Sequence, residues 1–252
     1  MKQLKFLMVA VTLLIGISLT SCIGEGDPTV TNVTFGQITS IFPIVIKTPY
    51  GVEYTATNSL ESDLYPGDYV YFQYSYNSDL VEQNATKIDA TITIGEKITY
   101  KPAVNVSDKG EDFESVTILQ VGNGPESNFK FLYYDKSKIL FPVMFLMKDL
   151  SKESLNKHDF TLVYNEEDVK ADDSEIVFYL RHKSSETEAK QRASAYKLFD
   201  INRALEQFKA KTGNKPTKVV VYTNETKDNT TDALDKKKDE LTKYEVVYEF
   251  KD

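Results

Sequence analysis

The 252-residue chain is acidic, with 38 aspartates and glutamates against 30 lysines and arginines and a formal net charge of −8. Such a charge repels the phosphate backbone, so we expect no nucleic-acid partner. The single cysteine excludes a disulfide within the chain. Its 16 tyrosines and 14 phenylalanines are side chains that favour pleated, half-buried strands, and they indicate a mainly β protein.

The amino-terminal residues have the layout of a secretory signal. Lys2 and Lys5 precede an apolar run over residues 6–19, and the small residues Thr20 and Ser21 follow. This order is typical of signal peptides, so residues 1–21 are predicted to be removed. A transmembrane helix is one alternative, although the run is short for a bilayer span. An ordinary secretory signal that happens to contain a cysteine is the other.

Residues 19–22, Leu-Thr-Ser-Cys, resemble the lipobox of bacterial lipoproteins. The resemblance implies that Cys22 is acylated and becomes the first residue of the mature chain, which its lipid then attaches to a membrane. Several acyl chains suffice for stable attachment. We therefore expect a cell-envelope protein at the outer membrane, with the leaflet and the side it faces left open. Residues 22–32 contain glycine, proline and acids and are predicted to be a flexible tether.

Residues 33–108 are predicted to form a small β-barrel, because short strands follow one another at regular spacing. In the stretch 69–76 the period of two puts Val70 and Phe72 on one face and Tyr69 and Tyr71 on the other. The strands are expected at residues 33–38, 41–47, 52–57, 69–76 and 88–94.

A polar segment over residues 102–112 marks the predicted domain boundary, and residues 113–252 are expected to form a β-sandwich-like domain. The most apolar stretch of the mature chain, residues 139–147, is predicted to be a buried strand because it is far too short to span a bilayer. Strands are expected at residues 116–121, 129–134, 139–147, 158–164, 175–181, 217–223 and 244–250, and a charged loop or short helix at 224–243.

One short helix is predicted in the second domain. Asp200 is its expected N-cap, and Ile201, Leu205 and Phe208 form an apolar stripe at helical spacing. Gly213 lies where a glycine commonly ends a helix.

Several short motifs, taken with the lipobox, resemble the NigD-like lipoproteins of Bacteroidota. They are Pro-Gly-Asp-Tyr-Val-Tyr-Phe-Gln-Tyr at 66–74, His-Asp-Phe-Thr-Leu-Val-Tyr at 158–164, Val-Phe-Tyr-Leu-Arg-His at 177–182 and Phe-Asp-Ile at 199–201. The resemblance implies an OB-like barrel followed by a carboxy-terminal β-sandwich. His158, Arg181 and His182 would then be structural residues of the family motifs. The resemblance implies no biochemical activity.

Tyr65, Tyr69 and Tyr71 are the candidate ligand-binding residues. If Val70 and Phe72 face the barrel core, Tyr69 and Tyr71 face outward, with Tyr65 just before the strand. Exposed aromatic rings can stack on sugars. Ordinary strand filling is the alternative, because tyrosine suits pleated surfaces in any case.

His158 and His182 are the only histidines of the chain. With Asp159 or Glu175 they could bind zinc, but no local metal-binding spacing is present. We therefore expect hydrogen-bonded residues at strand ends, without a metal or a cofactor. Arg181 is expected to bind a loop carboxylate rather than a substrate.

The acidic stretches at residues 108–112 and 166–173 lack the pattern of a calcium-binding loop and are predicted to be solvated. The sequence also lacks the Gly-x-Ser-x-Gly, phosphate-loop and His-Glu-x-x-His motifs. It therefore favours a lipid-anchored module that binds an envelope protein or a glycan and catalyses nothing. An extracytoplasmic hydrolase or metal-dependent enzyme with a site between the domains, and a structural subunit of a surface assembly, are the alternatives.

Overall fold

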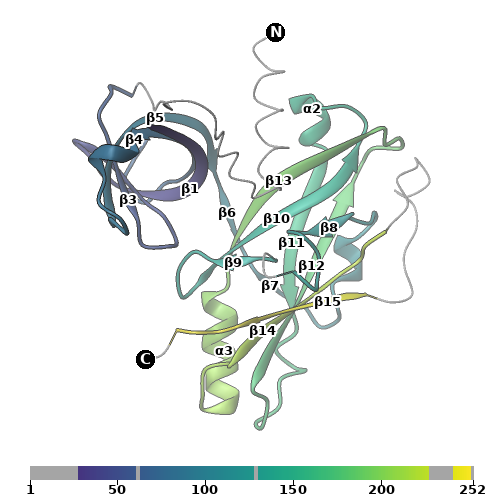
Figure 1. Ribbon diagram of the computed structural model, residues 1–252. Helices are drawn as coiled ribbons and strands as arrows, with labels where there is room; N and C mark the ends of the chain where they lie inside the picture. The colour runs from purple at the N-terminus through teal and green to yellow at the C-terminus, as the bar shows by residue number, and fades with distance from the viewer. Residues whose placement is uncertain (1–27, 61–62, 128–129, 227–240, 251–252) are drawn as a thin grey trace. The chain divides into compact units, whose positions relative to one another are not determined.

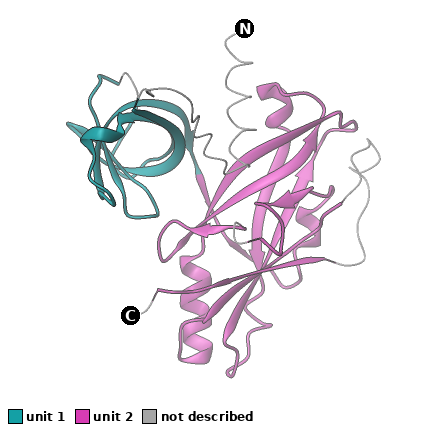
Figure 2. Ribbon diagram, in the orientation of Figure 1, with its two compact units in different colours: residues 1–99 teal, residues 100–252 magenta. Residues whose placement is uncertain are grey.

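The computed structural model describes residues 28–60, 63–127, 130–226 and 241–250. The predicted signal peptide, Cys22 and most of the charged segment 224–243 therefore lie outside the described residues. The chain divides into two compact units, residues 1–99 and residues 100–252 (Figure 2).

The first unit is a closed five-stranded barrel with the strand order β1-β2-β3-β5-β4 (Figure 1). All neighbours are antiparallel except β3 and β5, which run parallel. This is the OB-like architecture predicted for the first unit. Its strands are β1 (Thr29–Ile41), β2 (Ile44–Lys47), β3 (Glu53–Ala56), β4 (Tyr69–Asn77) and β5 (Lys87–Ile98).

The barrel closes because β1 is long enough to pair with two strands in turn. Its first part, from Thr29 to Gln37, pairs with β4, and from Gln37 onward it pairs with β2. Gly36 lies at this change of partner, where a Cβ atom would come within 2.4 Å of Ile46 Cγ2. A glycine is thus required there by the close approach of β2.

The predicted inward face of β4 is confirmed. Val70 and Phe72 are fully buried and pack in one core with Ile38, Ile46 and Ile92. The inner face of the barrel is thus filled with apolar side chains.

Two predicted boundaries in the barrel differ from the structure. β1 already begins at Thr29, so residues 29–32 of the predicted tether belong to a strand. The predicted strand over 41–47 is divided by a turn at Phe42 and Pro43, because proline cannot donate to a strand ladder.

The second unit contains two five-stranded sheets (Figure 1). Buried side chains from both sheets, among them Phe141 and Phe145 on one and Phe160 and Phe178 on the other, form a single core, as expected of a β-sandwich. The first sheet has the order β6-β13-β10-β8, with β9 also pairing with β10, and the second has the order β15-β14-β12-β11-β7. Their strands are β6 (Tyr100–Pro102), β7 (Val104–Asn105), β8 (Gln120–Val121), β9 (Leu132–Tyr133), β10 (Lys138–Met147), β11 (His158–Tyr164), β12 (Glu175–Ser184), β13 (Gln191–Asp200), β14 (Lys218–Thr223) and β15 (Thr242–Val247).

The second unit begins before the polar segment that marked the predicted boundary. β6 pairs with β13, and β7 pairs with β11, so residues 100–105 belong to the sandwich. Strand β13 was not predicted at all. Its residues are polar or half-exposed over most of its length, and only Leu198 and Phe199 are buried, so apolar periodicity is weak there.

The predicted helix is present as α3 (Asn202–Thr212), and a single turn, α2 (Lys152–Leu155), is additional to it. Asp200 lies one residue before the actual N-cap, Ile201, and its side chain accepts a hydrogen bond from the Asn202 amide. Gly213 ends the helix with a positive φ of 75°, as its position predicts.

Candidate functional site

The candidate tyrosines of the barrel have three different environments. Tyr65 is 64% exposed, and the Lys97 ammonium lies 5.8 Å from the centroid of its ring. Lys97 also forms an ion pair of 2.7 Å with Asp68, whose side chain accepts a hydrogen bond from the Tyr65 amide. The lysine and the aspartate therefore hold Tyr65 at the surface.

Tyr69 and Tyr71 do not form the exposed pair that alternation predicted. Tyr69 is only 6% exposed, so the prediction that it faces solvent is wrong. Alternation decides whether a side chain points into or out of a barrel, but it does not decide whether other parts of the chain cover the outer face. Tyr71 is half-buried, because its ring lies over Gly95 of β5, where a Cβ atom would be 3.1 Å from Tyr71 Cδ1.

Another exposed aromatic ring lies at the same end of the barrel as Tyr65. Phe42, at the tip of the turn between β1 and β2, is 90% exposed. The loop that carries Tyr65 is joined to this end of β1 by the Gly67 amide, which donates to the Ile38 carbonyl. We call this the aromatic end of the barrel. Sequence reasoning missed Phe42 because residues 41–47 were predicted to be one continuous strand.

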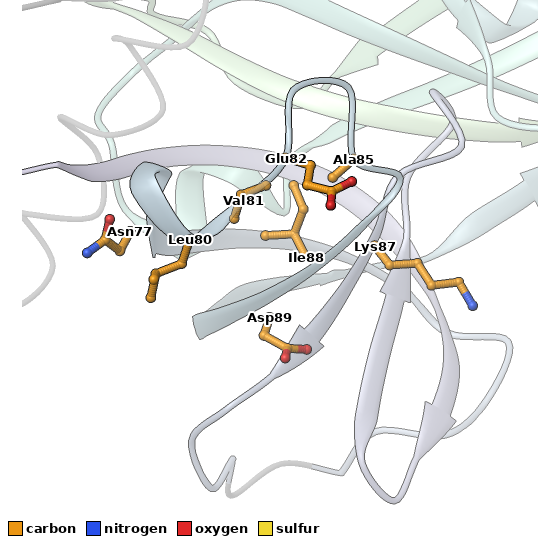
Figure 3. Close-up of a pocket in the computed structure, with 8 residues that line it drawn as sticks. All are labelled: Asn77, Leu80, Val81, Glu82, Ala85, Lys87, Ile88 and Asp89. Carbon is orange, nitrogen blue, oxygen red and sulfur yellow. The ribbon is translucent and has the colours of Figure 1, made fainter.

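The opposite end of the barrel has a shallow hollow of about 470 Å³ (Figure 3). It lies between the end of β4, the short helix η1 (Ser78–Leu80) and the start of β5. Its lining is mixed, with four apolar side chains beside amide, acidic and basic groups, and comprises Asn77, Leu80, Val81, Glu82, Ala85, Lys87, Ile88 and Asp89. A second hollow of about 590 Å³ lies beside the first turn of α3 in the second unit.

The two histidines, although far apart in sequence, are in contact in the core of the second unit. Phe160 of β11 pairs directly with His182 of β12, which places His158 beside His182 on the inner face of the hairpin. His158 Nδ1 lies 2.9 Å from His182 Nε2. The ring of His182 also stacks on Phe160 with a centroid distance of 4.3 Å and an interplanar angle of 5°.

A buried glutamate completes this cluster. Glu186 Oε2 lies 2.9 Å from His158 Nε2 and accepts the Lys148 amide at 2.7 Å, and Glu186 Oε1 accepts the Ser154 hydroxyl at 2.5 Å. At the other end, His182 Nδ1 lies 3.2 Å from the Thr117 carbonyl. Sequence reasoning missed Glu186 and Ser154, because both lie in loop or single-turn segments without a recognisable pattern.

Burial controls the ionisation of this cluster. It lowers the pKa of His182 to about 3, with a further contribution from nearby His158, and it lowers the pKa of His158. Burial by itself would raise the pKa of Glu186, but hydrogen bonds from Ser154, His158 and the Lys148 amide outweigh it and lower that pKa. At neutral pH the cluster therefore holds a carboxylate and two neutral imidazoles.

Arg181 forms a second buried polar cluster on the other face of β12. Its Nη1 donates to Glu114 Oε2 at 2.7 Å and its Nε to the Lys109 carbonyl at 2.8 Å. The other oxygen of Glu114 accepts from Asn224 Nδ2 at 2.8 Å. Arg181 thus joins its strand to two loops, through the Glu114 carboxylate and the Lys109 carbonyl.

The arrangement of serine, glutamate and histidines has the residue types of a hydrolytic site but not its accessibility. His158, His182, Ser154 and Glu186 are all buried, and each hydrogen-bonds within the cluster. A nucleophile must reach a bound substrate. Throughout the described ranges, no three histidine, cysteine, aspartate or glutamate side chains converge to hold a metal ion.

The fold is shared with solved structures from the Bacteroidales. A "putative lipoprotein" from Bacteroides fragilis matches with a TM-score of 0.67 and 21% identity over 87% of this chain and 99% of that one. A protein of unknown function from Bacteroides vulgatus matches with a TM-score of 0.56 and 11% identity, over 88% of this chain and 92% of that one. A NigD-like immunity protein from Bacteroides caccae is also among the similar structures, with a TM-score of 0.48 and 12% identity over 86% and 96%.

At such low identities the similarity shows a common fold alone. No protein-family model matches the chain, and no curated protein matches it. In the part of the chain that the structure describes, every helix is too short or too polar to cross a bilayer.

Proposed function

We propose that this protein is a lipid-anchored component of the cell envelope that binds a protein or a glycan and does no chemistry. The observation that carries the proposal is Cys22, the only cysteine, placed directly after a basic and apolar leader. The fold shared with the Bacteroides fragilis protein supports an envelope location.

The positions of the reactive groups support a role without catalysis. The histidines lie in the core, where they form hydrogen bonds with one another and with Glu186. The exposed aromatic groups support binding instead. Phe42 and Tyr65 lie at the aromatic end of the barrel, and aromatic rings contribute a large share of the energy at binding surfaces.

The anchoring part is tested by acyl labelling in a bacterial host that processes lipoproteins. The wild-type protein should incorporate a clickable palmitate analogue and fractionate with membranes, and Cys22→Ser should do neither. Undiminished labelling of the variant would show that acylation, if present, lies elsewhere.

The binding part is tested with the soluble chain starting after Cys22 on a glycan array and against purified envelope proteins. The double variant Phe42→Ser/Tyr65→Ser should lose at least tenfold in affinity for any ligand found, with an unchanged melting temperature. Tyr50→Ser is the matched control, because Tyr50 is 69% exposed but lies on the turn at the opposite end. Equal losses in both variants would contradict a site at the aromatic end.

A further inference from the structure

The amino-terminal chain enters the barrel at the end opposite the aromatic end. The Pro28 carbonyl accepts hydrogen bonds from both the amide and the hydroxyl of Ser78, at 2.8 and 2.9 Å. These bonds fix the start of β1 beside η1. The turn at residues 48–52 lies at the same end, because the Glu53 amide donates to the Thr86 carbonyl at 2.8 Å. We call this the entry end, formed by Pro28, turn 48–52 and loop 78–86.

The entry end exposes large apolar side chains that the core does not use. Leu80 is 83% exposed and Tyr50 is 69% exposed. Figure 3 shows Leu80 at the rim of the hollow, near Val81 and Ile88. Exposed leucine and tyrosine side chains beside polar groups are suited to the boundary between lipid and water, where tyrosine is enriched.

The length of the chain before β1 limits how far this end can lie from a lipid attached to Cys22. Only six Cα–Cα steps separate Cys22 from Pro28, so they span at most about 20 Å even when fully extended. The aromatic end lies farther away by the height of the barrel, which is roughly 25–30 Å for a tilted strand as long as β5.

We propose that the entry end of the barrel rests on the membrane surface that holds the lipid of Cys22, with Leu80 and Tyr50 in the headgroup region. The aromatic end, with Phe42 and Tyr65, then faces away from the membrane, so a partner would approach it from the side opposite the lipid. This inference rests on the proposed acylation of Cys22. It specifies which surface of the anchored protein remains available for binding.

Charge does not drive the proposed contact between the entry end and the membrane. The entry end carries acids at Asp79 and Glu82, with Asp89 of β5 close by. The ammonium of Lys87 is 3.7 Å from the Glu53 carboxylate. Anionic lipid would therefore not be favoured, and the contact suits a zwitterionic surface. It should also be insensitive to salt, because apolar burial is not screened by ions.

The experiment uses acylated protein in vesicles of phosphatidylcholine and phosphatidylethanolamine. Acylation consumes the thiol of Cys22, so one introduced cysteine can be labelled selectively with an environment-sensitive fluorophore. Asp79→Cys reports on the entry end, and Asp63→Cys, an exposed aspartate in the loop before β4, is its matched control at the aromatic end. Quenching is measured with lipids that carry a nitroxide near the headgroup.

We expect the label at position 79 to be quenched at least threefold more strongly than the label at position 63. Adding Leu80→Ser should reduce quenching at position 79, whereas adding Phe42→Ser should not. Equal quenching, or stronger quenching at position 63, in protein whose mass shows acylation would overturn the orientation and leave the proposed function intact. Absence of acylation in the same mass measurement would contradict both.

Discussion

His158 Nδ1 and His182 Nε2 lie 2.9 Å apart in the core of the sandwich, and their chain of contacts ends in acceptors on both sides. The Thr117 carbonyl faces His182 and the Glu186 carboxylate faces His158. The two imidazoles thus take part in three contacts, but in their neutral forms they carry only two N–H protons in total. One of the three contacts therefore has no proton. The protonation states of the two histidines and Glu186 determine how the second unit responds to acid.

The tautomers of the two rings follow from this geometry. A carboxylate can only accept, so His158 Nε2 carries its proton toward Glu186 and His158 Nδ1 is an acceptor. His182 Nε2 must then donate to His158, and the longest of the three contacts, 3.2 Å to the Thr117 carbonyl, receives no proton. Nitrogen-15 NMR of the imidazoles at pH 7 should show the Nε2–H tautomer for both rings. An imidazolium signal would instead show that a third proton is held in the core.

The stability of the protein should fall in acid. A histidine whose pKa is lowered in the folded state makes its full contribution to stability at pH values above the pKa of the unfolded state, about 6.5. This contribution is lost as the pH falls toward the pKa of the folded state, which is about 3 for His182. Each additional proton bound on unfolding lowers the free energy of unfolding by about 1.4 kcal/mol per pH unit. Urea unfolding at pH 7, 6, 5 and 4 measures this slope.

The variant His182→Phe tests the source of that slope. It should be less stable at pH 7, because the contact with His158 is lost, but its stability should fall less steeply between pH 6 and pH 4. A slope identical to that of the wild type would show that other groups cause the acid sensitivity.

Replacing only one partner of the ion pair between Arg181 and Glu114 should strongly lower the stability of the protein. Both side chains are almost completely buried, at 3% and 6% exposure. Removing one partner leaves a buried charge unpaired, so Arg181→Met or Glu114→Gln should each lower the free energy of unfolding by about 3–5 kcal/mol. The double variant should lose much less than the sum of the two. Additive losses in chemical unfolding would contradict a direct interaction.

Gly36 should be essential to closure of the barrel. An alanine Cβ would lie 2.4 Å from Ile46 Cγ2 and 2.9 Å from the Lys47 carbonyl oxygen, so neighbouring backbone must move. We expect Gly36→Ala to cost about 1–3 kcal/mol of stability, as overpacking does. Gly95→Ala is the control, because its nearest neighbour is the Tyr71 ring at 3.1 Å. The melting temperature should fall less for Gly95→Ala than for Gly36→Ala.

Much of the fold could be predicted because alternation is strong where one face of a strand is buried. Val70 and Phe72 in β4, and the apolar run of β10, show this clearly. Strand β13 escaped prediction because its pairing with β6 and β10, rather than its side chains, holds it in place. The burial of Tyr69 was also not predicted, since alternation sets the face of a strand on which a side chain lies but not how far that face is exposed.

The polar clusters could be predicted only in part. His158, Arg181 and His182 stand out in the sequence because such residues are rare in apolar strands. Their partners Glu186 and Glu114 lie in loops, among many other acids of the chain. Only the register of the β11–β12 hairpin, which pairs Phe160 with His182, shows that the two histidines meet.

The most direct test of the account is the mass of the amino-terminal peptide of the protein purified from membranes. We predict that the mature chain begins at Cys22 and that the peptide carries a thioether-linked diacylglyceryl group together with an amide-linked acyl chain. A chain that begins at any other residue, or a Cys22 with a free thiol, would contradict it.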